Sequence, residues 1–274
     1  MRPFSWFVKL YILLGVIYGV FITVFEVSDP LYNVFGVLLT VMPLLGFVFG
    51  ILVGKQWGGI ESMVGRSLLS ISLSLLAWAL GQGVFFYYSM TLEEIPYPGL
   101  PDYFFIFIDP FYALALLAIM KYAGAKSNMK TAFAYLLLLV VPLASIYINY
   151  YLFFGELSIF SEIDSAVVFD LIYTFGSIAI MALTVITVAL SIRTLGGKMR
   201  VAIYMFFLGF ALQYAGDIFY SMLEAQGISY VGSLSDLIYF LSIASVTLGL
   251  LKMNAKSLDG VVSSAPVLET KNGT

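Results

Sequence analysis

Acidic side chains inside long apolar stretches are the residues best suited to chemistry in this sequence. Asp109, Asp170 and Asp217 each interrupt such a stretch, and the amides Gln82 and Gln213 lie in the apolar stretches 67–90 and 201–223. A charged side chain at the centre of a helix in lipid costs at least about 2.5 kcal/mol, so it usually faces a bundle interior or a water-filled cavity. Carboxylates and amides in that position predict a polar pocket for a small cationic or amphipathic ligand.

Tyrosines extend this set, because several fall at a similar depth. We expect the ligand-binding residues to be Asp109, Asp217, Gln82, Gln213, Tyr88 and Tyr220, all in the outer third of the membrane. Other phenols that could share this layer are Tyr87, Tyr112, Tyr173 and Tyr214. The alternative for Asp109 and Asp217 is a shallow, hydrated position within an interfacial aromatic belt, and for Asp170 this alternative is favoured.

Missing residue types exclude several chemistries. The sequence has no Cys and no His, which excludes thiolate nucleophiles, disulfides, Cys-ligated metals and the His-Glu-x-x-His zinc motif. It has no P-loop and no Gly-x-Ser-x-Gly motif. Every Lys falls near the end of an apolar stretch, where it could not form a buried Schiff base. We therefore expect no enzymatic activity, no catalytic residue, no metal site and no cofactor.

The composition predicts that these residues are positioned by helices in a lipid bilayer. The chain is 61% hydrophobic and 11% charged, with a mean hydropathy of +1.01. A soluble domain carries roughly 25% charged residues. A helix needs about 20 apolar residues to cross a membrane. The sequence predicts an all-α integral membrane protein with eight transmembrane helices, and no nucleic-acid partner. The expected spans are 5–25, 33–54, 67–90, 102–122, 131–154, 166–192, 201–223 and 234–252. The fourth is the least regular, because Asp109-Pro110 interrupts it.

Charge placement predicts the orientation. All 13 Lys and Arg residues fall in connections or helix ends on one side, and the opposite connections carry only acidic residues. Because basic residues mark cytoplasmic loops, we expect a protein of the cell membrane with both termini in the cytoplasm. Two termini on one side require an even number of spans, which favours eight over seven.

Two segments repeat one pattern and predict an internal duplication. Tyr88-Ser89-Met90 corresponds to Tyr220-Ser221-Met222, and Asp102 corresponds to Asp236. Four crossings separate the copies, so the two units would be parallel repeats related by an axis along the membrane normal. We expect four-helix repeats at 1–126 and 127–256, followed by a disordered cytoplasmic tail at 257–274. Chance similarity between apolar segments is the alternative.

Asp102 and Asp236 also have a purely structural explanation. Each lies where a predicted helix begins, and a carboxylate there interacts favourably with the helix dipole and can cap free backbone amides. We expect capping, rather than ligand binding, to be their main role.

One stretch resembles a known class of signalling module. The matching residues are Trp78, Gly81, Tyr87-Tyr88, Pro96-Tyr97-Pro98, Asp102-Tyr103-Phe104 and Asp109-Pro110-Phe111-Tyr112. This pattern resembles the multi-pass membrane sensor modules found before diguanylate cyclase or histidine kinase domains in bacterial and archaeal proteins. The resemblance covers about residues 70–125, with an echo at 205–255, and Gly99 replaces the usual Ser. It implies sensing of a ligand or of the membrane state, relayed to a cytoplasmic output domain that the sequence does not contain.

Two functions therefore remain open. A sensor or ligand-binding module would signal through a separate cytoplasmic signalling protein. A small transporter or ion-translocating protein is the alternative, because duplicated helical units with acidic residues at their interface are common there. A transport pathway should continue to the cytoplasmic half, where the sequence offers only Thr, Ser and Gly. That difference favours sensing.

Overall fold

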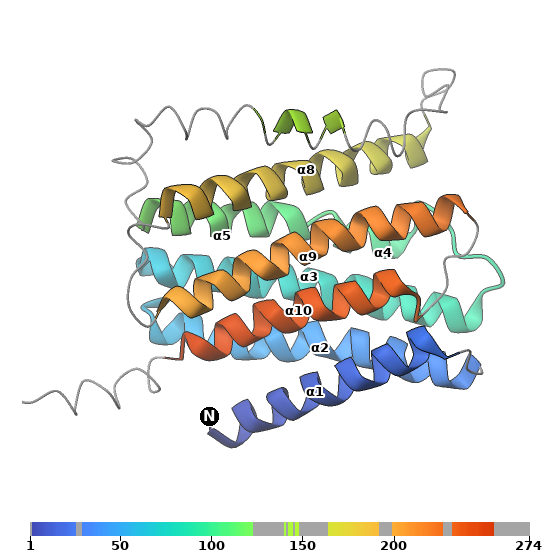
Figure 1. Ribbon diagram of the computed structural model, residues 1–274, viewed down its shortest axis with the longest axis horizontal. Coiled ribbons are helices and arrows are strands. Elements are labelled where there is room, and N and C mark those ends of the chain that lie inside the picture. The colour runs from blue at the N-terminus through green and yellow to red at the C-terminus, as the bar shows by residue number, and fades with distance from the viewer. Residues whose placement is uncertain are drawn as a thin grey trace, which may run out of the picture.

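The computed structural model describes residues 2–25, 29–122, 140, 142–144, 146–147, 164–191, 199–226 and 232–254. Its elements are α1 (Arg2–Val24), α2 (Asp29–Gln56), η1 (Gly59–Glu61), α3 (Met63–Thr91), α4 (Leu100–Phe105), α5 (Ile108–Tyr122), α8 (Ser165–Ser191), α9 (Met199–Ala225) and α10 (Leu234–Lys252). Within these ranges the protein is helical and contains no strand. Figure 1 shows the helices packed side by side in one elongated bundle.

Seven spans in the described residues are long and apolar enough to cross a membrane. The protein is therefore a multi-pass α-helical membrane protein, as the composition predicts. The expected fifth span at 131–154 lies almost wholly outside the described residues, and the expected tail at 257–274 lies entirely outside them. The total of eight spans and the duplication stay predictions.

The fourth predicted span differs from the expectation in one respect. The helix is divided after Phe105, and Asp109-Pro110 does not interrupt it but belongs to the first turn of α5. Proline is well tolerated there, because the first amides of a helix have no intrahelical acceptor and its missing N–H costs nothing. Pro110 therefore helps α5 to begin and brings Asp109 to its first turn.

Helix α10 is the centre of the bundle and packs against α9, α2 and α1. Small residues let the backbones approach, as is usual between membrane helices. A Cβ added at Gly249 of α10 would lie 2.5 Å from the ring of Phe206 on α9, and one at Gly46 of α2 would lie 2.6 Å from the Thr247 hydroxyl oxygen. Exposed apolar side chains on the outer helices, such as Leu13 and Ile17 of α1, then face lipid.

The bundle has a basic end and an acidic end. At the basic end the starts of α3 and α9 meet the ends of α5 and α10 around one small cavity. Helix-terminal Lys and Arg residues gather here: Lys55, Arg66, Lys121, Arg200 and Lys252. The acidic end holds the starts of α4, α8 and α10 and the end of α9, and α5 begins further in, nearer the middle of the bundle.

Helices α5 and α8 are parallel neighbours. Asp170 near the start of α8 accepts a hydrogen bond from Tyr97, which precedes α4. One turn further along α8, Tyr173 donates to Asp102 of α4. One more turn along, Gly176 lies against Asp109 of α5. Helices α5 and α8 therefore both run from the acidic side of the bundle toward the basic end.

Candidate functional site

Asp217 of α9 is held by hydroxyl donors from two other helices. Ser177 of α8 donates to one carboxylate oxygen at 2.5 Å, and Tyr239 of α10 donates to the other at 2.9 Å. The Tyr239 ring fits closely over Gly216, where a Cβ would lie 2.6 Å from a ring carbon. The edge of Trp78 on α3 also meets this ring, with centroids 5.6 Å apart. Four helices thus fix the position of one carboxylate.

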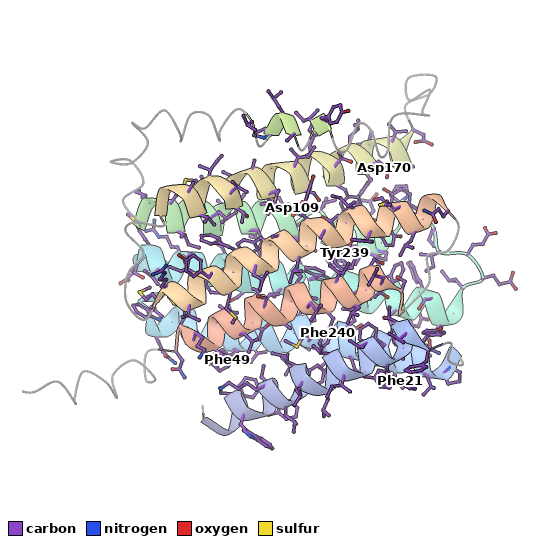
Figure 2. The ribbon with its side chains drawn as sticks, viewed as in Figure 1. Phe21, Phe49, Asp109, Asp170, Tyr239 and Phe240 are labelled. Atoms are coloured by element: carbon purple, nitrogen blue, oxygen red, sulfur yellow. The ribbon has the colours of Figure 1, made fainter. Side chains whose placement is uncertain are left out.

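Asp109 lies next to this arrangement and has weaker partners. The amide nitrogen of Gln213 on α9 is 3.5 Å from Asp109 Oδ1, the outer limit of a hydrogen bond. The other oxygen, Oδ2, lies directly against Gly176 of α8. Asp109 is close enough to Asp217 for the two carboxylates to interact electrostatically. Figure 2 labels Asp109 and Tyr239 among the side chains of the bundle.

We call Asp109, Gln213, Asp217, Ser177 and Tyr239 the acidic cluster. Its members come from α5, α8, α9 and α10. The helix-terminal Lys and Arg side chains lie at the basic end, so the described residues provide no cation to this cluster. Chemically, the cluster can accept a cation or a hydrogen-bond donor. No group of three His, Cys, Asp or Glu residues that could hold a metal occurs in the described part of the chain.

Asp102 and Asp236 cap helices, as the sequence predicts. The backbone amide of Gly99 donates to Asp102 Oδ2 at 2.7 Å, and that of Gly232 donates to Asp236 Oδ2 at 2.8 Å. Asp102 has a second partner, because Tyr173 of α8 donates to its Oδ1 at 2.8 Å. Its carboxylate therefore both caps α4 and joins α4 to α8.

A tyrosine joins the connection before α4 to α8. The Tyr97 hydroxyl donates to the exposed carboxylate of Asp170. Partial burial and this hydrogen bond raise the pKa of the Tyr97 phenol above its usual range, so it remains a donor at neutral pH. Asp170 is exposed on the bundle surface, and the hydrated position favoured for it from sequence stays a prediction.

The structure brings three of the six predicted ligand-binding residues together: Asp109, Gln213 and Asp217. Tyr220 follows Asp217 by one turn and lies near Glu224 and Asp236. The other two are on α3, where Gln82 is buried and the ring of Tyr88 packs on Tyr87. Neither α3 residue is hydrogen-bonded to the acidic cluster, and their part in ligand binding stays a prediction.

Sequence reasoning missed the residues that hold Asp217, which are Ser177 and Tyr239. Serine and tyrosine are frequent throughout this chain, with 19 Tyr residues in all. Nothing in their local sequence distinguishes these two from the others. The one available signal was helical spacing, since Ser177 lies one turn beyond Tyr173, which the sequence did place in this layer.

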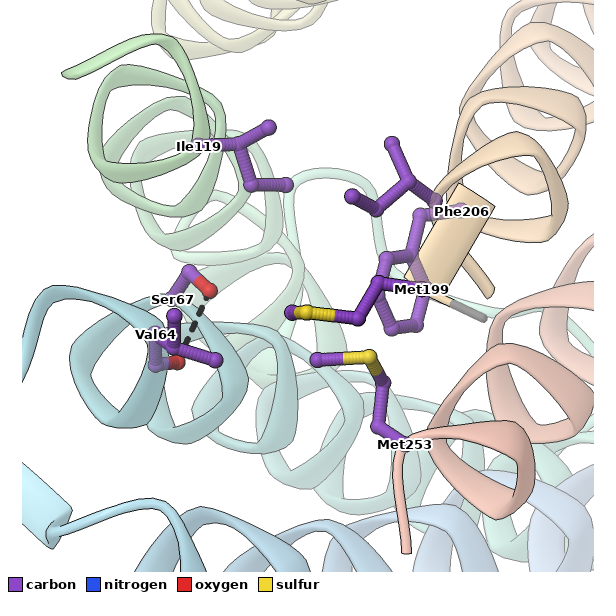
Figure 3. A pocket seen from close by; sticks show the side chains of 7 residues that line it. Val64, Ser67, Ile119, Met199, Phe206 and Met253 are labelled. Atoms are coloured by element: carbon purple, nitrogen blue, oxygen red, sulfur yellow. Dashed lines mark hydrogen bonds between the residues drawn. The ribbon is translucent and has the colours of Figure 1, made fainter. Parts of the chain in front are cut away.

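The cavity in Figure 3 lies at the basic end and not beside the acidic cluster. Its volume is about 10 Å³, enough for about one water molecule. Its walls are almost entirely apolar and include Ile119, Met199, Phe206 and Met253. An outward-facing pocket at the acidic end stays a prediction.

No known protein family matches this sequence, and no curated protein and no solved structure is detectably similar to it. The acidic cluster itself is therefore the basis for any functional assignment.

Proposed function

We propose that this membrane protein is a ligand-binding sensor whose acidic cluster faces the outside of the cell and takes a cationic ligand. One observation carries the proposal: adjacent residues of α8 contact the two carboxylates, since Gly176 lies against Asp109 and Ser177 donates to Asp217, while the helix-terminal basic side chains of the described residues lie at the other end of the bundle. Carboxylates inside a membrane bundle are costly and usually functional.

A cation would bind this cluster preferentially for an electrostatic reason. Two neighbouring carboxylates repel each other, and a positive charge or a hydrogen-bond donor between them relieves that repulsion. The hydroxyl groups of Ser177 and Tyr239 already stabilise Asp217. Asp109 has no comparable donors, so a ligand would gain most by contacting Asp109.

Helix α8 is the element best placed to carry the signal. Near its start it is hydrogen-bonded to the Tyr97 segment, to α4 and to α9 through Asp170, Tyr173 and Ser177. A ligand that moves Asp109 or Asp217 would change the contacts of α8, and a helix transmits such shifts along its length. The receiver would be a separate cytoplasmic signalling protein at the basic end.

The proposed orientation follows from charge. The basic end would be cytoplasmic, with both termini there, by the positive-inside rule. Because α5 ends at the basic end and α8 begins at the acidic end, the parallel course of these two described helices favours eight crossings over seven.

The test compares two aspartate variants. Asp217→Asn keeps the shape of the side chain and removes its charge, and Ser177 can rotate its hydroxyl to accept from the new amide. Asp236→Asn removes a charge from the same end of the bundle but from a capping position. Purified protein in detergent is screened for thermal stabilisation by inorganic cations and organic amines.

We expect at least one cation to stabilise the wild type and Asp236→Asn, and to stabilise Asp217→Asn much less. Sensing by this cluster is wrong if no cation or amine stabilises the wild type. It is equally wrong if Asp217→Asn responds as strongly as the wild type.

Transport remains the second hypothesis, but the helix packing beside the cluster favours binding without passage. Directly below Asp109 and Gln213, the rings of Tyr112 and Phe210 pack at a centroid distance of 4.4 Å. Liposomes containing the protein should show no flux of Na⁺, H⁺ or organic cations above that of empty liposomes. Flux that Asp217→Asn abolishes would establish transport instead.

A further inference from the structure

One buried oxygen at the acidic cluster has no partner. Gln213 is only 7% exposed, and its Oε1 makes no hydrogen bond to any described residue. Leaving a buried acceptor unsatisfied costs about 1–3 kcal/mol, so such atoms usually have a partner that is not protein. The other end of the same amide points at Asp109, which places the free oxygen at the edge of the cluster.

Asp109 is also the least satisfied aspartate of this end. Asp217 accepts bonds of 2.5 and 2.9 Å, and Asp102 accepts bonds of 2.7 and 2.8 Å. Asp109 receives only the 3.5 Å contact from Gln213. A 180° rotation of the Gln213 amide exchanges its oxygen and nitrogen, and would turn Oε1 toward Asp109. Two oxygens facing each other at this distance can be bridged by a cation or by a proton on Asp109.

A third oxygen lies one turn below. The hydroxyl of Tyr112 is fully buried and makes no well-formed hydrogen bond to a described residue. Nearby Ser74 uses its own hydrogen to donate to the carbonyl oxygen of Ile108 at 3.0 Å. Tyr112 follows Asp109 by three residues on α5, and its ring packs on Phe210, three residues before Gln213 on α9. The pair Tyr112–Phe210 thus lies one helical turn from the pair Asp109–Gln213, between the same two helices, α5 and α9.

The chemistry of these atoms selects the ligand. A carboxylate, an amide oxygen and a phenol oxygen are hard donors, which suit alkali and alkaline-earth cations. One directly contacting carboxylate balances a single positive charge. Gly176 fills the Oδ2 side of Asp109, where even a methyl group would clash, so a ligand must approach from the Oδ1 side, where Gln213 is only 3.5 Å away. A bare ion fits this description and an organic ammonium does not.

We propose that Asp109, Gln213 and Tyr112 form a binding site for one sodium ion. This inference rests on the proposed function and specifies its ligand class. Sodium bound here would satisfy the free oxygen of Gln213 and neutralise Asp109. It would also link α5 to α9 beside α8, so that ion binding tightens the acidic end.

The experiment measures sodium binding to the purified full-length protein in detergent. Thermal unfolding is followed as sodium chloride replaces choline chloride at constant ionic strength, and ²³Na NMR line broadening reports binding directly. Gln213→Met removes the free oxygen and keeps the length of the side chain. Thr247→Val is the matched control, because Thr247 on α10 also has a fully buried side-chain oxygen without a hydrogen-bond partner among the described residues, and it lies against Gly46 of α2 and not in the cluster.

We expect sodium to raise the melting temperature of the wild type and of Thr247→Val. The dissociation constant for sodium should rise at least tenfold in Gln213→Met, and sodium dependence should be lost in Asp109→Asn. Tyr112→Phe should weaken binding to a smaller extent. If the variants do not fold, line broadening by the wild type that lithium competes away would support the site, and its absence would overturn it.

Other outcomes separate this inference from the proposed function. If amines stabilise the protein through Asp217 while sodium does nothing, the sodium site is wrong and the sensor proposal stands. If acidification alone stabilises the protein and sodium adds nothing, a proton neutralises Asp109 and the sodium site is wrong. If neither alkali cations nor amines have any effect, both proposals fail.

Discussion

A single methyl group at Gly176 should disturb the acidic cluster while leaving the rest of the bundle unchanged. In the variant Gly176→Ala, the new Cβ would overlap Asp109 Oδ2 and would lie 3.2 Å from Asp109 Cγ. The carboxylate must therefore move by about 1 Å to reach ordinary van der Waals contact. Ligand distances in ion sites are reproducible to about 0.2 Å, so this shift is several times the tolerance.

In Gly176→Ala, the free energy of unfolding should change less than the affinity for sodium. Alanine in a helix is favoured over glycine by about 0.5–1 kcal/mol, which stabilises the variant. Overpacking costs typically about 1–3 kcal/mol, and the overlapping atoms belong to a short side chain that can rotate away. The net effect on the free energy of unfolding should lie between about zero and 2 kcal/mol of destabilisation. Sodium binding should be weakened at least tenfold, because Asp109 moves relative to Gln213.

The assay is the sodium titration described above, with thermal unfolding and ²³Na line broadening. Gly83→Ala is the matched control. Gly83 is in the interior of α3, and a Cβ there meets only a methyl carbon of Thr40 at 3.6 Å. It should gain about 0.5–1 kcal/mol of stability and bind sodium as the wild type does.

The reasoning is refuted if Gly176→Ala folds and binds sodium with unchanged affinity. That result would mean that Asp109 does not need its present position, and hence that it is not a direct ligand. Equal loss of binding in Gly83→Ala would show that the assay reports general helix perturbation instead.

Further predictions concern the caps, the basic end and the orientation. Asp102→Asn should destabilise the protein by about 1 kcal/mol in thermal unfolding: the Tyr173 hydroxyl can turn to accept from the new amide, but neither hydrogen bond then has a charged partner. Asp236→Asn keeps its one acceptor and should cost about 1 kcal/mol or less. Trp57→Phe removes a 2.6 Å bond from the indole to the carbonyl oxygen that follows α10, and should cost about 0.5–1.5 kcal/mol in the same measurement. Reporter fusions after Lys126 and after Lys198 should both report the cytoplasm, and an extracellular signal from either would contradict the assigned orientation.

Helix positions were largely predictable from the sequence, because the membrane imposes one dominant constraint. A span must be long, apolar and internally hydrogen-bonded. A hydropathy profile reports the length and the apolar character directly. Helix α10, for example, begins and ends where the sequence placed it, at 234 and 252. The division between α4 and α5 was not predictable, because apolar residues occupy the break and Pro110 suggested a different position.

The acidic cluster was predictable in part, and for a physical reason. A carboxylate in an apolar span is conspicuous because of its cost, so Asp109 and Asp217 stood out. The partners of Asp217 are a serine and a tyrosine, which cost little free energy to place in a membrane helix. Ser177 and Tyr239 could equally have faced another helix or the interface, and only the rotation of α8 and α10 in the bundle decides that they reach Asp217.

Side chains of α5 and α9 meet along much of the bundle, and we call this line of contacts the seam. Its composition explains why we favour sensing over transport. Asp109 faces Gln213 at the acidic end, and Tyr112 packs on Phe210 one turn below. Further along the same two helices, Ile119 and Ile203 line the cavity at the basic end. The seam thus changes from charged to aromatic to aliphatic. Between Tyr112 and the cavity, α5 offers an ion no side-chain oxygen, and passage along this seam would require Tyr112 and Phe210 to separate. Binding energy at such a closed site goes into the helix contacts around it, and a change in helix contacts is what a sensor transmits.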